Sequence, residues 1–105
     1  MKLHPDVAAL FNKCKELRQG LHRIPEIGFE EYNTQAYIIN ELEQCSPDGI
    51  QTLAGTGVKA VFYASGAETT IAFRADMDGL QIEELTESAY MSEHPGKMHA
   101  CGHDG

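Results

Sequence analysis

The sequence predicts an α/β fold in which two helices pack on one face of a mixed sheet. Two amphipathic segments come first in the chain, and three short β-rich segments separated by glycine turns follow them. Hydrophobic residues make up 42% of the 105 residues and charged residues 23%, which is ordinary usage for a folded domain. Helices followed by strands, without repeats, favour a single layered unit over residues 1–105.

Regular spacing of apolar side chains defines the two helices. Over residues 5–21 they recur every three or four positions, which is the spacing of one helical face. The same spacing returns over residues 30–44, where glutamates at the start suit the positive end of the helix dipole. Pro25 and Gly28 indicate a loop between the helices, and Gly20 suits a fraying helix end.

Three runs of β-branched and apolar residues predict strands. They cover residues 50–53, 58–64 and 69–74. Glycine-containing turns separate them, so the sequence predicts neighbouring strands joined by tight connections.

Charge and cysteine content exclude several classes of function. Sixteen acidic against eight basic residues give a net charge of -8, which disfavours nucleic-acid and membrane partners. The first residues lack the apolar run of a signal peptide or a membrane span, so we expect a cytoplasmic protein. Cys14 and Cys45 have no ligand-type neighbours, and we interpret them as packing residues.

The final segment has the densest set of metal-ligand side chains. In Met98-His99-Ala100-Cys101-Gly102-His103-Asp104-Gly105, four candidate ligands fall within six positions. A thiolate, imidazoles and a carboxylate suit Zn²⁺, and they also accept Mn²⁺, Co²⁺ or Ni²⁺. Only two or three side chains of one short loop can reach one ion, so this segment predicts half of a metal site.

A second candidate site follows the last predicted strand, in Arg74-Ala75-Asp76-Met77-Asp78. Asp76 and Asp78 would orient a metal-binding imidazole or line a substrate pocket. The alternatives are an Asx turn and an ion pair with Arg74, and spacing alone does not decide between them.

The remaining polar residues give weaker signals. His22 and Glu26 lie in a charged loop, where solvated surface and helix capping are both common. We expect His4 and His94 at the surface.

Four segments of the chain resemble the amidohydrolases of peptidase family M20, which include hippurate, N-acetyl amino acid and indoleacetyl amino acid hydrolases. They span about residues 21–105 in the order and approximate spacing of that family: LHRIPEIGFEEYNTQ, GTGVKAVF, AFRADMDGLQI and GKMHACGHDG. The resemblance implies the truncated N-terminal portion of a zinc-peptidase-like catalytic domain, without a lid or dimerisation domain.

The resemblance also implies roles for single residues. Cys101 and His103 match family metal ligands, and the implied cofactor is a divalent ion, Zn, Mn, Co or Ni. Asp76 resembles the carboxylate that supports the metal centre and is the candidate catalytic residue, while Arg74 replaces a ligand of other branches. The resemblance leaves open the roles of Asp78, His99 and Asp104. Gly79 and Gln81 depart from the family, which commonly has Ala and Pro there.

The implied reaction is hydrolysis of an N-acyl amino acid or small peptide by a metal-activated water. The family's general-base glutamate would lie beyond Gly105, so we expect the 105-residue chain alone to be inactive. A homo-oligomer is possible for such an enzyme. The competing hypothesis is a non-catalytic binding or assembly module derived from the same fold. A structural zinc module is disfavoured, because the segment lacks a second ligand pair at finger-like spacing.

Overall fold

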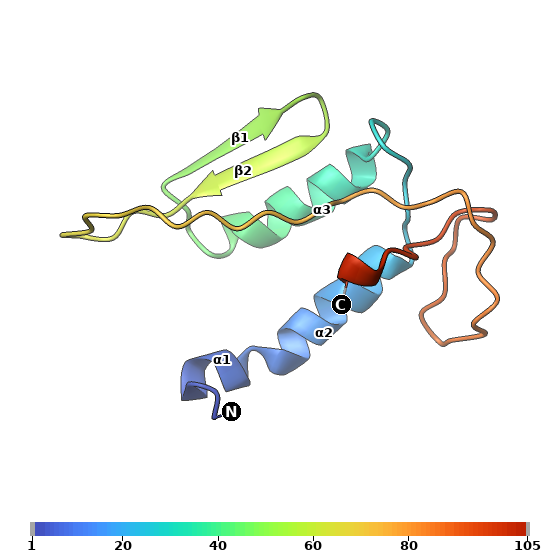
Figure 1. Ribbon diagram of the computed structural model, residues 1–105, viewed down its shortest axis with the longest axis horizontal. Helices are drawn as coiled ribbons and strands as arrows, with labels where there is room; N and C mark the ends of the chain where they lie inside the picture. Colours follow the sequence, from blue (N-terminus) through green and yellow to red (C-terminus); the bar gives the residue numbers. More distant parts are fainter. Residues whose placement is uncertain (1, 105) are drawn as a thin grey trace.

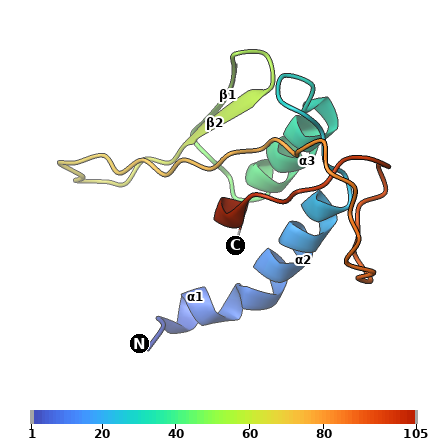
Figure 2. The same cartoon turned by 45° about the vertical axis from the view of Figure 1, so that its right-hand side comes forward.

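The computed structural model describes residues 2–104, which form helices, one antiparallel hairpin and a short 3-10 helix (Figure 1). The helix α3 lies beside the hairpin and forms one layer with it, and α1 and α2 form a second layer below them (Figure 2). The predicted α/β class is confirmed, and the sheet within the described residues is the antiparallel β1–β2 pair. The elements are α1 (Pro5–Ala9), α2 (Phe11–His22), α3 (Tyr32–Glu43), β1 (Gly49–Leu53), β2 (Gly57–Val61) and η1 (Gly102–Asp104).

The first predicted helix is divided in two by Leu10. Pro5 occupies the first turn of α1, and the His4 ring accepts a weak bond from the backbone nitrogen of Asp6 at 3.4 Å. Gly20 was predicted to lie at the helix end, but α2 continues to His22. A Cβ at Gly20 would lie 2.5 Å from the Tyr37 hydroxyl, so glycine permits close contact with α3. No helix within residues 2–104 has the length and apolar run needed to cross a membrane.

The hairpin is anchored to the start of α3. Its strands pair from Gly49 with Val61 to Leu53 with Gly57, as the sequence predicted for neighbouring strands. The Thr56 hydroxyl in the hairpin turn donates to the Glu31 carboxylate at 2.6 Å. The side chains of Thr56 and Glu31 are both buried, so this bond fixes the hairpin against the helix.

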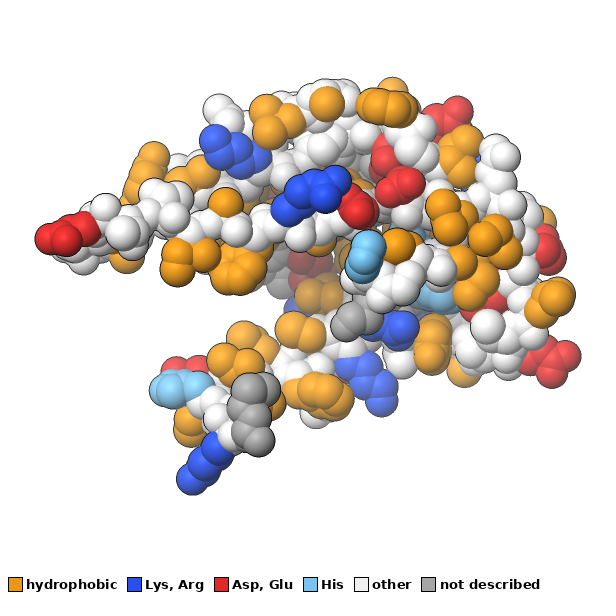
Figure 3. Space-filling view, in the orientation of Figure 1, with side chains coloured by type: hydrophobic (Ala, Val, Ile, Leu, Met, Phe, Trp, Pro, Cys, Tyr) orange, Lys and Arg blue, Asp and Glu red, His pale blue; other side chains and the backbone are white. Residues whose placement is uncertain are grey.

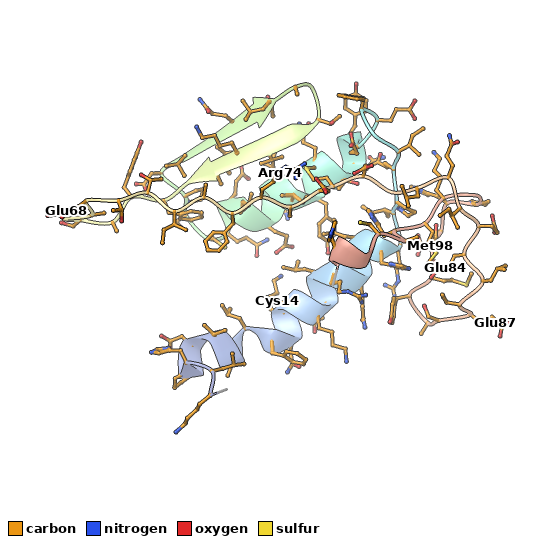
Figure 4. The ribbon with its side chains drawn as sticks, in the orientation of Figure 1. Cys14, Glu68, Arg74, Glu84, Glu87 and Met98 are labelled. Atoms are coloured by element: carbon orange, nitrogen blue, oxygen red, sulfur yellow. The ribbon has the colours of Figure 1, made fainter. Side chains whose placement is uncertain are left out.

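The third predicted strand is not part of the sheet. Residues 69–74 form no strand, although they follow an extended course (Figure 1). Residues 62–74 make a projecting arm whose tip is near Glu68 (Figure 4). The exposed fractions of Ile71 and Phe73 in this arm are 77% and 95%. A strand requires a hydrogen-bonded neighbour, and β-branched composition alone does not supply one.

The described residues do not enclose an aliphatic or aromatic core. None of their apolar side chains except that of Pro25 is buried. The accessible surface is 8216 Å², whereas a compact monomer of this mass would expose roughly 5,800 Å². The radius of gyration is 15.5 Å, against about 13 Å for a compact domain of this length. Cys14 and Cys45 are exposed, so the prediction that they pack inside is wrong for this chain.

Glu26 caps α3 from the preceding loop. Its carboxylate accepts bonds from the backbone nitrogens of Asn33 and Thr34 at 3.2 and 2.6 Å, and from the Thr34 hydroxyl at 2.7 Å. Burial raises the pKa of Glu26, but these donors outweigh it and lower the pKa below its ordinary value. Of the two alternatives for the His22–Glu26 loop, helix capping is correct for Glu26.

Glu26→Ala is expected to lower the free energy of unfolding by about 3 kcal/mol, because it leaves buried donors of Thr34 without an acceptor. Glu30→Ala is the matched control, because Glu30 is exposed in the same loop. Its expected effect is within about 0.5 kcal/mol. Urea unfolding followed by circular dichroism measures both variants, and equal losses would contradict the capping role.

Candidate metal centre

The segment with the predicted metal ligands is attached to the loop between α2 and α3. Leu80 and Met98 form an isolated antiparallel bridge with N–O distances of 2.8 and 3.0 Å. Gly79 donates its backbone N–H to the carbonyl of Glu26 at 2.6 Å, and a Cβ there would lie 2.8 Å from Cβ of Pro25. Glycine therefore allows the loop, the aspartate segment and the metal-ligand segment to meet.

Cys101 and His103 lie together at the start of η1. Their Sγ and Nδ1 atoms are 3.6 Å apart. Two such ligands of a tetrahedral zinc ion would be separated by roughly 3.5 Å, given Zn–S and Zn–N lengths of about 2.3 and 2.0 Å. Within residues 2–104, no three Cys, His, Asp or Glu side chains come together as a complete site. The donor pair has the separation that two ligands of one divalent ion need, and the assignment of Cys101 and His103 as metal ligands stays a prediction.

A large hollow joins the two predicted sites. Its volume is about 1040 Å³, and Arg74, Asp76, His99, Cys101 and His103 all line it. Hydrophobic side chains lie on both sides of the opening between the arm and the lower helices (Figure 3). The structure thus brings the aspartate segment and the thiol–imidazole pair to one cavity.

Arg74 and Asp76 form an ion pair at 2.7 Å between Nη2 and Oδ1. The exposed fractions of the two side chains are 87% and 43%, so both remain accessible from the cavity. The ion pair with Arg74 is therefore present, and Asp76 also lines the cavity, so both alternatives stay open for its carboxylate. Asp78 is exposed and does not line this cavity.

A buried cluster centred on Glu84 also lines the cavity and was not predicted. Its carboxylate accepts from His22 Nε2 at 2.8 Å, the Thr86 hydroxyl at 2.7 Å and the Ser92 backbone nitrogen at 2.5 Å. The exposed fractions of the Glu84 and His22 side chains are 2% and 11%. No sequence spacing could reveal the pair, because its members are 62 positions apart.

Burial raises the pKa of Glu84, but its hydrogen bonds have the opposite effect and prevail. The Ser92 backbone N–H, the His22 ring and the Thr86 hydroxyl lower the pKa to about 2. Glu84 is therefore an ionised carboxylate inside the cavity wall near neutral pH.

Two further histidines, His94 and His99, also lie in this region. The surface position expected for His94 does not hold, and the role of His99 stays open. His94 is half-buried and its Nδ1 lies 2.8 Å from the Pro25 carbonyl, so the surface prediction is wrong. His99 is half-buried in the cavity wall, with its ring 6.3 Å from that of His22. The side chain of Asp104 and the whole of Gly105 lie outside the described residues.

Comparisons with known proteins agree with this arrangement. Residues 72–105 match the model of peptidase family M20/M25/M40. The N-acetyldiaminopimelate deacetylase of Bacillus velezensis is 49% identical over 89 residues, which are 84% of this chain and 24% of that protein. The N-acetyldiaminopimelate deacetylase of Halalkalibacterium halodurans is 46% identical over 90 residues, which are 85% of this chain and 24% of that protein. The chain belongs to peptidase family M20.

The fold of a solved M20 protein matches as well. A dinuclear metal-binding M20 peptidase of Bacillus subtilis superimposes with a TM-score of 0.83 and 36% identity, covering 92% of this chain and 28% of that one. This M20 chain spans about a quarter of the length of the curated relatives it matches. The predicted membership of the family and the zinc-peptidase-like fold are confirmed.

Proposed function

We propose that this chain forms part of a divalent-metal-dependent amidohydrolase that removes the acyl group from an N-acylated amino acid. The observation that carries the proposal is the convergence of Cys101 Sγ and His103 Nδ1 at 3.6 Å in a cavity that Asp76 also lines. The names of the relatives support N-acetyldiaminopimelate as the first substrate to test, ahead of hippurate and other N-acyl amino acids or small peptides.

Cys101 and His103 would hold the metal, and the dinuclear metal binding of the Bacillus subtilis relative supports this assignment. When bound, a divalent ion polarises the acyl carbonyl and activates water for attack. Zinc suits the thiolate and imidazole donors, and Mn, Co and Ni are the alternatives to compare.

Asp76 would support the metal centre from the facing side of the cavity. Its ion pair with Arg74 restricts the orientation of the carboxylate, and a fixed carboxylate near metal ligands increases their basicity and order. The exposed guanidinium of Arg74 also presents donors that suit a substrate carboxylate.

The general base is proposed to come from outside the described residues. The carboxylates among these residues that line the cavity are Asp76 and Glu84. Arg74 engages the first, and His22, Thr86 and Ser92 engage the second. Glu84 is a poor proton acceptor, because these hydrogen bonds lower its pKa to about 2.

Acetate release from N-acetyldiaminopimelate and benzoate release from hippurate test this function. The gene product as its host makes it is expected to release acetate with added zinc or cobalt, and a chelator should abolish this release. Activity that persists after metal removal would refute the proposal. The isolated 105-residue chain is expected to show no turnover, and turnover by it would refute the need for an outside base.

A further inference from the structure

Glu84 connects three separate parts of the chain. One carboxylate oxygen accepts from His22 at the end of α2 and from Thr86, and the other accepts from the Ser92 backbone. All three bonds are 2.8 Å or shorter. The carboxylate is therefore fixed in orientation, and it fixes the His22 ring in turn.

The His22 ring also lies near the segment with the metal ligands. Its ring lies 5.7 Å from that of Tyr90 in an edge-on arrangement, and 6.3 Å from the ring of His99 at 43°. His99 follows Met98, whose backbone pairs with Leu80. The backbone bridge and the His22–His99 contact thus hold the chain just before Cys101.

We infer that Glu84 is a positioning residue that acts through His22 on His99 and so orients the metal-binding loop of residues 98–103. The inference rests on the proposed metal role of Cys101 and His103. Glu84, His22, His99 and Cys101 line the same cavity, so the chain of contacts ends at the candidate ligands.

The cost of burying the Glu84 carboxylate suggests that the Glu84–His22 pair orients its neighbours and does not serve folding stability alone. An ionised carboxylate loses its hydration on burial, and an apolar residue of similar volume often stabilises a core as well as a buried ion pair does. A carboxylate–histidine pair next to metal ligands is instead suited to fix the orientation of neighbouring groups. Its removal should therefore weaken metal binding even in protein that remains folded.

Cobalt binding to the protein separates these two roles. The background carries Cys14→Ser and Cys45→Ser, because both residues are exposed and Cys101 then provides the remaining thiol. Glu84→Gln and His22→Leu are expected to weaken Co²⁺ affinity about 10- to 100-fold and to change the thiolate-to-cobalt absorption band. His22→Gln keeps an N–H donor for Glu84 but lacks the ring beside His99, so it should not recover the affinity.

Glu68→Gln is the matched charge control, because Glu68 is exposed at the tip of the arm, far from Glu84 (Figure 4). Its cobalt affinity and absorption band should equal those of the background. Circular dichroism of the metal-free variants reports folding. If Glu84→Gln does not fold, Thr86→Val removes one bond to Glu84 and is expected to weaken affinity several-fold.

Three results overturn the inference. Unchanged cobalt affinity and band in folded Glu84→Gln, or in Thr86→Val if it replaces that variant, would overturn it alone. Full recovery of affinity by His22→Gln would also overturn it, because that variant lacks the ring that lies beside His99. No thiolate band in the background protein would remove the proposed metal role as well, which distinguishes the two failures.

Discussion

Cys101→Ser is expected to weaken zinc binding at least roughly 100-fold, since loss of outer-shell partners alone typically costs 10- to 100-fold. Cys101 supplies the soft ligand of the Sγ–Nδ1 pair, and a serine hydroxyl binds zinc poorly because it stays protonated near neutral pH. Oxidation of Cys101 should have the same effect, because sulfinic acid no longer offers a thiolate. Isothermal titration calorimetry with Zn²⁺ measures the change.

Cys14→Ser is the matched control for this experiment. Cys14 also lines the cavity but lies on α2 (Figure 4), and it is not a member of the Sγ–Nδ1 pair that Cys101 and His103 form. Its zinc affinity should stay within a factor of about two of the unmodified protein, since coordination requires ligand geometry and not mere proximity. Equal losses in Cys14→Ser and Cys101→Ser would contradict the assignment of Cys101.

Acid is expected to destabilise the protein through Glu84. Its pKa is about 2 in the folded protein, against an ordinary value of 4.5. A lowered folded pKa gives stability that is fully present above about pH 4.5 and is lost as pH falls toward 2. The loss amounts to about 3 kcal/mol for this side chain. Glu26, whose pKa is also lowered, adds to the loss in the same direction.

Urea unfolding between pH 7 and pH 3 measures this dependence. Glu84→Gln should be less stable than the unmodified protein at pH 7 and should lose less stability on acidification, because its amide does not titrate. Glu87→Gln is the control, since Glu87 is exposed in the same loop. Parallel pH profiles for the unmodified protein and Glu84→Gln would show that Glu84 does not contribute.

Local sequence signals predicted the elements that short-range contacts determine. The helices, the hairpin and the Cys101–His103 pair depend on residues a few positions apart, and the structure contains all of them. The break at Leu10 was not predicted, because the apolar spacing continues through it. The prediction of a third strand was wrong, because residues 69–74 have the composition of a strand but no neighbouring strand to pair with.

Long-range contacts lay beyond the reach of sequence patterns. The bond between His22 and Glu84 joins the end of α2 to an irregular segment 62 positions further along the chain, and the segment around Glu84 shows no helical or strand period. His94 was expected at the surface, yet its ring Nδ1 lies 2.8 Å from the Pro25 carbonyl. Backbone bonds from Glu93 to the Arg23 carbonyl and from Gly79 to the Glu26 carbonyl hold these distant segments against the loop at residues 23–26.

The exposed apolar surface bears on the module hypothesis. A stand-alone binding module needs a closed core, and the described residues bury only Pro25 among their apolar side chains. Exposed Phe73 and Ile71 on the unpaired arm favour association with further polypeptide. This surface supports the proposal that the chain works as part of a larger catalytic domain.

X-ray absorption at the zinc edge tests the central claim, which is that Cys101 and His103 bind a divalent metal. If Cys101 and His103 bind zinc, we expect one sulfur neighbour per zinc at about 2.3 Å together with an imidazole nitrogen at about 2.0 Å. The sulfur signal should vanish in Cys101→Ser and persist in Cys14→Ser. A zinc shell of oxygen and nitrogen alone, or a sulfur signal that survives Cys101→Ser, would contradict the account.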